Sequence, residues 1–186
     1  MLSKKLLMRL FFAIPVPGEI KTKLLSAFPA KAFPGIRFIA AENLHITVHF
    51  LGSTEKEKLN LILLQAKKTA ERSSAFEIKF HSLKTIFKQR KPVMIWAQFE
   101  NNKAFESLCS KFQNEFPTGE TRTPNPHITL ARIKQLKQLP FEIPELKTFS
   151  FVADSVQLFE SFTYEDGAKY KMIDEWELKP HPQSFS

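Results

Sequence analysis

The chain has 186 residues, of which 43% are hydrophobic and 25% are charged, a balance typical of a folded globular protein rather than a disordered one. Lysine and arginine number 27 against 19 aspartates and glutamates, and the resulting net charge of +8 favours a polyanionic partner. Cys109 is the only cysteine, which excludes an intrachain disulfide and a cysteine-based zinc site, and the sequence contains no glycine-rich nucleotide-binding loop.

Helices are expected where apolar residues recur every three or four positions, and strands where short apolar or alternating runs are bounded by proline, glycine or polar residues. The expected helices cover residues 19–28, 54–72 and 101–116. The expected strands cover residues 9–16, 36–39, 44–51, 76–83, 93–99, 127–133, 149–159 and 169–178. Thr54 is the expected N-cap of the second helix, and Glu57 would complete a capping box with it.

The order of these elements lacks the regular alternation that a doubly wound parallel sheet requires. It instead suggests two similar halves, each with a helix and with one strand that carries a His-x-Thr sequence. We therefore expect an α+β fold with two pseudo-symmetric halves, in which antiparallel sheets line a central cleft and the helices lie outside. No low-complexity linker divides the chain, so residues 1–186 are expected to form a single bilobal domain.

A repeated tetrapeptide carries most of the functional information. It reads His-Ile-Thr-Val from position 45 and His-Ile-Thr-Leu from position 127. Because side chains two positions apart in a strand project from the same face, His45 and Thr47 share one face, as do His127 and Thr129. Each strand thus presents an imidazole and a hydroxyl together.

This pairing suits phosphoryl chemistry without a metal. A neutral imidazole can take a proton from water, and an imidazolium can give one to a leaving alkoxide near neutral pH. A threonine hydroxyl can donate a hydrogen bond to a phosphate oxygen. The sequence has no His-Glu-x-x-His, no cysteine pair and no clustered aspartates, so we expect neither a metal nor another cofactor.

The chain resembles the 2H phosphoesterase superfamily, and within it the RNA 2′,3′-cyclic phosphodiesterases related to 2′-5′ RNA ligases. Besides the two tetrapeptides, the landmarks that carry the resemblance occur in the order of the family and span nearly the whole chain. They are Arg-Leu-Phe-Phe-Ala-Ile from position 9, Arg-Phe-Ile-Ala-Ala-Glu-Asn-Leu from 37, Phe-Leu-Gly from 50, Pro-His-Ile-Thr-Leu-Ala-Arg from 126, Leu-Phe-Glu-Ser from 158 and Gly-Ala-Lys-Tyr from 167.

The resemblance implies hydrolysis of a 2′,3′-cyclic phosphate to a 2′-phosphate. In this scheme His45 is the proton donor to the leaving 3′-oxygen, and His127 is the proton acceptor that activates water. Thr47 and Thr129 bind the phosphate. Arg132 also sits at a family position, as a phosphate contact or in a structural ion pair, but strict alternation points it away from the face of His127 unless a bulge intervenes.

Further candidates border the same strands. His49 falls on the face of His45 by alternation and is expected at the rim of the cleft. Phe50 and Tyr170 are candidates for stacking on a base, with core packing as the alternative for the phenylalanine. A basic stretch between strands (Lys84, Lys88, Arg90 and Lys91) is either a solvated loop or a contact with the RNA backbone.

Other functions remain open at this point: 2′-5′ RNA ligation at the same site, hydrolysis of a small cyclic phosphate, and a non-catalytic basic RNA-binding module. The expected partner is RNA with a 2′,3′-cyclic phosphate end, such as a tRNA fragment. No apolar run reaches the length of a membrane span and no signal-peptide cleavage pattern is present, so a cytoplasmic monomer without membrane contact is expected.

Overall fold

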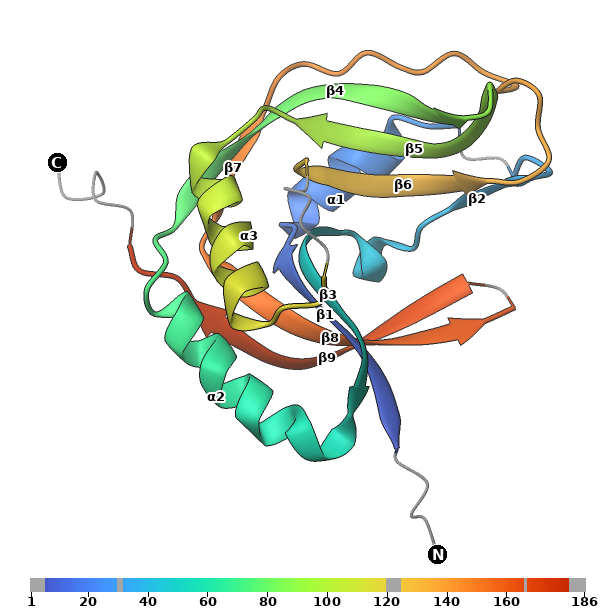
Figure 1. Cartoon of the computed structure of the whole chain (residues 1–186). Helices are drawn as coiled ribbons and strands as arrows, with labels where there is room; N and C mark the ends of the chain where they lie inside the picture. The colour runs from blue at the N-terminus through green and yellow to red at the C-terminus, as the bar shows by residue number, and fades with distance from the viewer. Residues whose placement is uncertain (1–5, 30–31, 120–124, 166, 181–186) are drawn as a thin grey trace, which may run out of the picture.

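The strands of the chain form two antiparallel sheets in the computed structural model, which describes residues 6–29, 32–119, 125–165 and 167–180 (Figure 1). The first sheet has the order β3 (His45–Glu55), β1 (Leu7–Pro15), β8 (Ser155–Tyr164) and β9 (Gly167–Glu177). The second has the order β2 (Ile36–Phe38), β6 (His127–Ile133), β5 (Lys91–Phe99), β4 (Phe76–Lys88) and β7 (Ser150–Ala153). The predicted α+β class with antiparallel sheets is confirmed.

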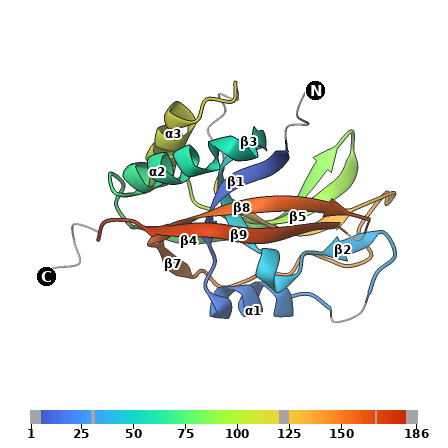
Figure 2. The same ribbon diagram turned by 90° about the horizontal axis from the view of Figure 1, so that it is seen from below.

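The helices are α1 (Gly18–Ser26), α2 (Leu59–Ala70) and α3 (Lys103–Glu115), and a short 3₁₀ turn, η1 (Ala41–Asn43), precedes β3. Figures 1 and 2 show α2 and α3 side by side on one side of the molecule and α1 on the opposite side. The ring of Phe12 on β1 packs against Phe112 of α3, with ring centroids 4.6 Å apart, and against Phe116, at 5.1 Å. The apolar run of β1 is fully buried from Leu10 to Ile14 because the strand is central in its sheet and covered on both faces.

The expected start of the second helix is wrong. Thr54 pairs with Met8 as part of β3, and a 3₁₀ turn (Lys56–Lys58) separates the strand from α2, which begins at Leu59. The Thr54 hydroxyl donates to the carbonyl oxygen of Gly52 instead of capping a helix. Long-range pairing with β1 therefore overrides the local capping pattern. In α3, by contrast, the Asn102 side chain accepts hydrogen bonds from the backbone of Ala104 and Phe105.

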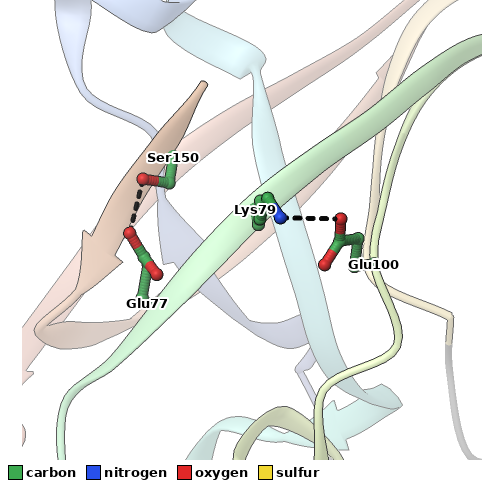
Figure 3. A network of polar contacts seen from close by, with 4 residues as sticks. All are labelled: Glu77, Lys79, Glu100 and Ser150. Carbon is green, nitrogen blue, oxygen red and sulfur yellow. Dashed lines mark hydrogen bonds and ion pairs between the residues drawn. The ribbon is translucent and has the colours of Figure 1, made fainter. Parts of the chain in front are cut away.

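The strand expected over residues 149–159 is two strands that belong to different sheets. β7 pairs with β4 in the second sheet, whereas β8 pairs with β1 in the first, and the chain crosses between the sheets at Asp154. Figure 3 shows the edge to which β7 is attached: the Ser150 hydroxyl donates to the Glu77 carboxylate, and Lys79 Nζ lies 3.3 Å from Glu100 Oε1. These contacts lie at the end of the second sheet that is opposite β2.

The basic stretch is a hairpin rather than a loop. β4 continues to Lys88, β5 begins at Lys91, and Gln89 and Arg90 form the turn with φ angles of 50° and 62°. Positive φ at both turn residues is the geometry of a tight two-residue hairpin. Lys84 and Lys91 therefore belong to strands, and both side chains are exposed.

Candidate active site

The two strands that carry the histidines contain matching β-bulges. In β3, Thr47 pairs with Ala13 and His49 with Phe12, which leaves Val48 as an extra residue. In β6, Thr129 pairs with Trp96 and Ala131 with Ile95, which leaves Leu130 as the extra residue. The bulge thus lies at the same distance from each histidine. This agreement is a residue-level sign of the similarity between the two halves.

The bulges change which side chains face the cleft. Counted from the histidine that begins each strand, the fourth and fifth residues are buried and the sixth is exposed. His49 therefore corresponds to Ala131, and Phe50 corresponds to Arg132. Because the bulge shifts the alternation by one residue, Arg132 lies on the same face of β6 as His127. His49 borders the pocket as expected, but because of the bulge it breaks strict alternation with His45 and is buried rather than at an open rim. The His49 ring is only 3% exposed, and its Nε2 donates to the carbonyl oxygen of Phe116 over 2.7 Å.

The strands β3 and β6 approach each other across the two sheets (Figure 1). Residues of both strands line a pocket of about 530 Å³. Eight of the residues singled out from the sequence border it: His45, Thr47, His49, Phe50, His127, Thr129, Arg132 and Tyr170. Phe50 is 53% exposed, so its ring is not a core residue. The hairpin cations Lys84, Lys88, Arg90 and Lys91 are not among the residues that line this pocket. The fold thus brings the two histidine–threonine pairs to one cavity.

Both histidines are held by the same hydrogen bond. Nδ1 of His45 lies 2.7 Å from the carbonyl oxygen of Asn43, and Nδ1 of His127 lies 2.8 Å from the carbonyl oxygen of Asn125. A carbonyl oxygen only accepts, so Nδ1 must carry the proton, and in the neutral ring Nε2 is left with its lone pair. The arrangement leaves Nε2 of each ring as the nitrogen available for proton transfer.

The sequence analysis missed this pair of asparagines, although a signal was present. An asparagine stands two residues before each histidine, so the repeat is Asn-x-His-x-Thr rather than His-x-Thr. Other pocket residues without a signal in the sequence are Ile39, Met94, Trp96 and Gln113. They come from several elements and meet only in the folded chain.

Burial lowers the pKa of both imidazoles. The pKa of His45 falls from 6.5 to about 4, mainly because the ring is removed from solvent; the hydrogen bond to Asn43 opposes this effect, and the charge of His127 adds to it. Burial likewise lowers the pKa of His127 from its ordinary 6.5, again opposed by the bond to Asn125. Both rings are therefore neutral at pH 7 in the free protein. A bound anionic phosphate would favour the protonated form of either ring.

Aromatic rings surround the two histidines differently. The His45 ring lies 5.0 Å from Phe11 and 5.2 Å, edge to face, from Tyr170. The His127 ring stacks on Trp96, with centroids 3.7 Å apart and an angle of 20° between the planes. Trp96 Nε1 is buried and has no hydrogen-bond partner within the described part of the chain. Both imidazoles are thus confined, one by a cluster of rings and one by a single stacked face.

Other types of site are not apparent in the described residues. No group of three or more histidine, cysteine, aspartate or glutamate side chains is placed there to hold a metal ion. Burial raises the pKa of the Cys109 thiol to about 12, so it is not a reactive nucleophile. None of the helices in the described segments is long and apolar enough to cross a membrane.

Comparisons with known proteins agree over most of the chain. A family model described as the 2′-5′ RNA ligase superfamily matches residues 23–162. An RNA 2′,3′-cyclic phosphodiesterase of Methanocaldococcus jannaschii is 31% identical over 178 residues, covering 91% of this chain and 100% of the relative. A protein of the same name from Escherichia coli K12 is 28% identical over 183 residues, covering 91% and 96%.

Solved structures show the same architecture. E. coli LigT complexed with 3′-AMP superposes with a TM-score of 0.74 at 25% identity, covering 94% of this chain and 99% of LigT. A Thermus thermophilus protein superposes with a TM-score of 0.80 at 22% identity, covering 93% and 99%, and supports the fold alone.

Proposed function

The chain belongs to the 2′-5′ RNA ligase superfamily, and we propose on this basis that it is an RNA 2′,3′-cyclic phosphodiesterase that uses two histidines as acid and base. One observation carries the proposal. His45 and His127 border one pocket, and each has Nδ1 bonded to a carbonyl oxygen, so each offers Nε2 for proton transfer. Curated relatives from several organisms bear the name of this enzyme.

The reaction would proceed with one proton transfer at each histidine. His127 Nε2 accepts a proton from water as the water oxygen forms a bond to phosphorus. The bond between phosphorus and the 3′-oxygen breaks, and protonated His45 Nε2 donates its proton to that oxygen. The product is a 2′-phosphate beside a free 3′-hydroxyl. The assignment of acid to His45 and base to His127 follows the family resemblance.

The remaining pocket residues would stabilise the phosphate. The Thr47 and Thr129 hydroxyls donate hydrogen bonds to its non-bridging oxygens, and the Arg132 guanidinium offsets the charge that develops on them. The anionic phosphate also raises the pKa of His45, which supplies the protonated acid that the free protein lacks at neutral pH.

The same residues can carry out the same displacement with a different nucleophile. If the 5′-hydroxyl of a second RNA replaces water, attack on the cyclic phosphate and loss of the 3′-oxygen join the two ends through a 2′-5′ linkage. The description of the matching family favours this second activity. Incubation with tRNA half-molecules would detect it as a joined product.

The first experiment uses an oligonucleotide that ends in a 2′,3′-cyclic phosphate, in excess chelator. We expect the product to gain one water and to carry a terminal 2′-phosphate, identified by mass and phosphatase sensitivity. His45→Ala or His127→Ala should lower turnover by roughly 10²–10⁴-fold, the usual contribution of general acid–base catalysis.

His81→Ala is the matched control, because His81 is exposed on β4 and does not line the pocket. Near-normal turnover in either His45→Ala or His127→Ala would refute the two-histidine mechanism. Strict dependence on an added divalent ion would refute its metal independence.

A further inference from the structure

The catalytic pocket continues into two adjoining hollows of about 410 Å³ and 440 Å³. Both share Arg132 and Tyr170 with the catalytic pocket, and the larger one also shares Phe50. They share Arg37 with each other. We call the two hollows together the basic groove. Its lining residues come from β2 and β6 of the second sheet and from the β8–β9 hairpin and β1 of the first.

Cations predominate along the basic groove. The positively charged side chains that line it are Arg9, Arg37, Arg132, Lys134 and Lys169, and the acidic ones among the described residues are Glu42 and Glu165. Arg9, Arg132 and Lys134 are exposed, so their charges are accessible to a ligand. A row of cations in a concave surface concentrates positive potential and attracts polyanions.

Two arginines are placed side by side at the junction with the catalytic pocket. Arg37 on β2 pairs directly with Arg132 on β6, so both side chains leave the same face of the sheet. Side chains of a directly opposite pair lie close enough together to contact the same ligand group.

The guanidinium group of Arg37 lies against the hairpin opposite. A Cβ added at Gly167 would collide with the guanidinium group of Arg37, so the absence of a side chain there makes room for that group. The Asn43 side chain also donates to the carbonyl oxygen of Ala168 over 3.2 Å. The guanidinium of Arg37 thus lies at the hairpin and lines both hollows that adjoin the catalytic pocket.

We propose that the basic groove binds the RNA strand upstream of the reacting end, with Arg37 and Arg132 receiving the phosphodiester that joins the last two nucleotides. This proposal rests on the proposed function, because the cyclic phosphate is taken to lie between the two histidines. Arg9 and Lys134 then contact backbone phosphates further from the end. A mononucleotide fills the catalytic pocket and leaves the groove empty.

The groove therefore favours polymers over mononucleotides by adding contacts at a second phosphate. The test measures binding of an oligonucleotide with a 2′-phosphate end and of a mononucleoside 2′-phosphate at several salt concentrations. Because both ligands are products of the proposed reaction, their binding to the groove can be measured whether or not the protein hydrolyses a cyclic phosphate. The rates of hydrolysis of the matching cyclic phosphates are measured beside it.

Arg37→Gln should weaken binding of the oligonucleotide about tenfold and leave the mononucleotide within about twofold, since one charged phosphate contact is lost. The log–log salt slope for the oligonucleotide should fall by about 0.7. Arg9→Gln combined with Lys134→Gln changes exposed residues and should act in the same direction, which guards against a folding defect in Arg37→Gln. Lys103→Gln is the control, because Lys103 is exposed on α3 away from the groove.

Equal losses for both ligands, or an unchanged salt slope in both groove variants, would overturn the groove assignment. If the wild type hydrolyses neither cyclic phosphate but binds the oligonucleotide with the expected slope, the proposed function fails and the groove remains as an RNA-binding surface.

Discussion

The indole of Trp96 lies stacked on the imidazole of His127, with the two ring centroids 3.7 Å apart and the planes 20° from parallel. The two residues come from neighbouring strands, β5 and β6, and Trp96 pairs with Thr129 across them. The stack fixes the plane of the imidazole from one side, while the hydrogen bond from Nδ1 to the Asn125 carbonyl fixes its rotation.

We expect Trp96→Leu to lower kcat/KM about tenfold, because the face of an aromatic ring stabilises the imidazolium that forms when His127 takes a proton. The loss of that stabilisation lowers the pKa of His127, so the acid limb of the kcat/KM profile should move to lower pH. Trp96→Phe keeps a stacked ring, so its kcat/KM should lie between those of the wild type and Trp96→Leu. Wild-type rates and an unmoved acid limb in both variants would show that Trp96 only fills space.

The lowered pKa values place the optimum of kcat/KM below neutrality. The acid must be protonated, so activity falls as the pH rises through the pKa of His45, about 4. The base must be neutral, so activity falls as the pH drops through the pKa of His127, which lies below 6.5. A bell-shaped profile of kcat/KM with its maximum below pH 6.5 is therefore expected.

The profile of kcat should lie at higher pH, because the bound phosphate raises the pKa of both rings. Steady-state rates over a range of buffers, with a cyclic-phosphate substrate, give both profiles. A kcat/KM maximum in alkaline solution would contradict the assignment of two buried imidazoles as the titrating pair.

The same shift links pH to the stability of the fold. The pKa of His45 is about 4 in the folded chain and near 6.5 when exposed, so the unfolded state binds more protons between these values. This contribution to stability is present above pH 6.5 and is lost as the pH falls toward 4. We expect urea midpoints to fall over this range and to fall less steeply in His45→Gln. Identical slopes for the variant and the wild type would count against a depressed pKa.

His49 is expected to act on stability rather than on turnover. Its ring is buried and donates to the Phe116 carbonyl, so His49→Ala leaves a cavity and an unpaired acceptor. The expected loss is about 2–4 kcal/mol in the free energy of unfolding, measured by urea denaturation. At a temperature where the variant is folded, kcat/KM should stay within a few-fold of wild type. Normal stability with abolished turnover would place His49 among the catalytic groups instead.

The pairing of each imidazole with a hydroxyl could be predicted because it depends on short spacings. Two residues of a strand that are separated by one position share a face whatever the strand pairs with, so His45 with Thr47, and His127 with Thr129, follow from the sequence alone. The period of the apolar residues likewise located the three helices, with errors at their ends. The class of fold followed from the order of these elements.

Features that depend on a partner strand could not be predicted. The bulges at Val48 and Leu130 exist because β1 and β5 skip one residue of their neighbours, and no local pattern encodes that register. They turn Arg132 toward the pocket, and they bury the side chain of His49 at its margin. The start of α2 was misplaced, and the break at Asp154 was not predicted, for the same reason. Pairing of β3 and β8 with β1, and of β7 with β4 in the other sheet, decides where those strands end.

The sequence by itself therefore determined which groups share a face of each strand, because an imidazole and a hydroxyl two positions apart face one way in any strand. Only the tertiary structure decided how those groups are set: Asn43 and Asn125 behind the imidazoles, Trp96 against His127, and Arg37 beside Arg132 at the mouth of the basic groove. Some of these contacts join residues that are distant in the chain, and others join a side chain to the backbone two residues before it. Strand register and packing fix their geometry, and a linear pattern contains neither.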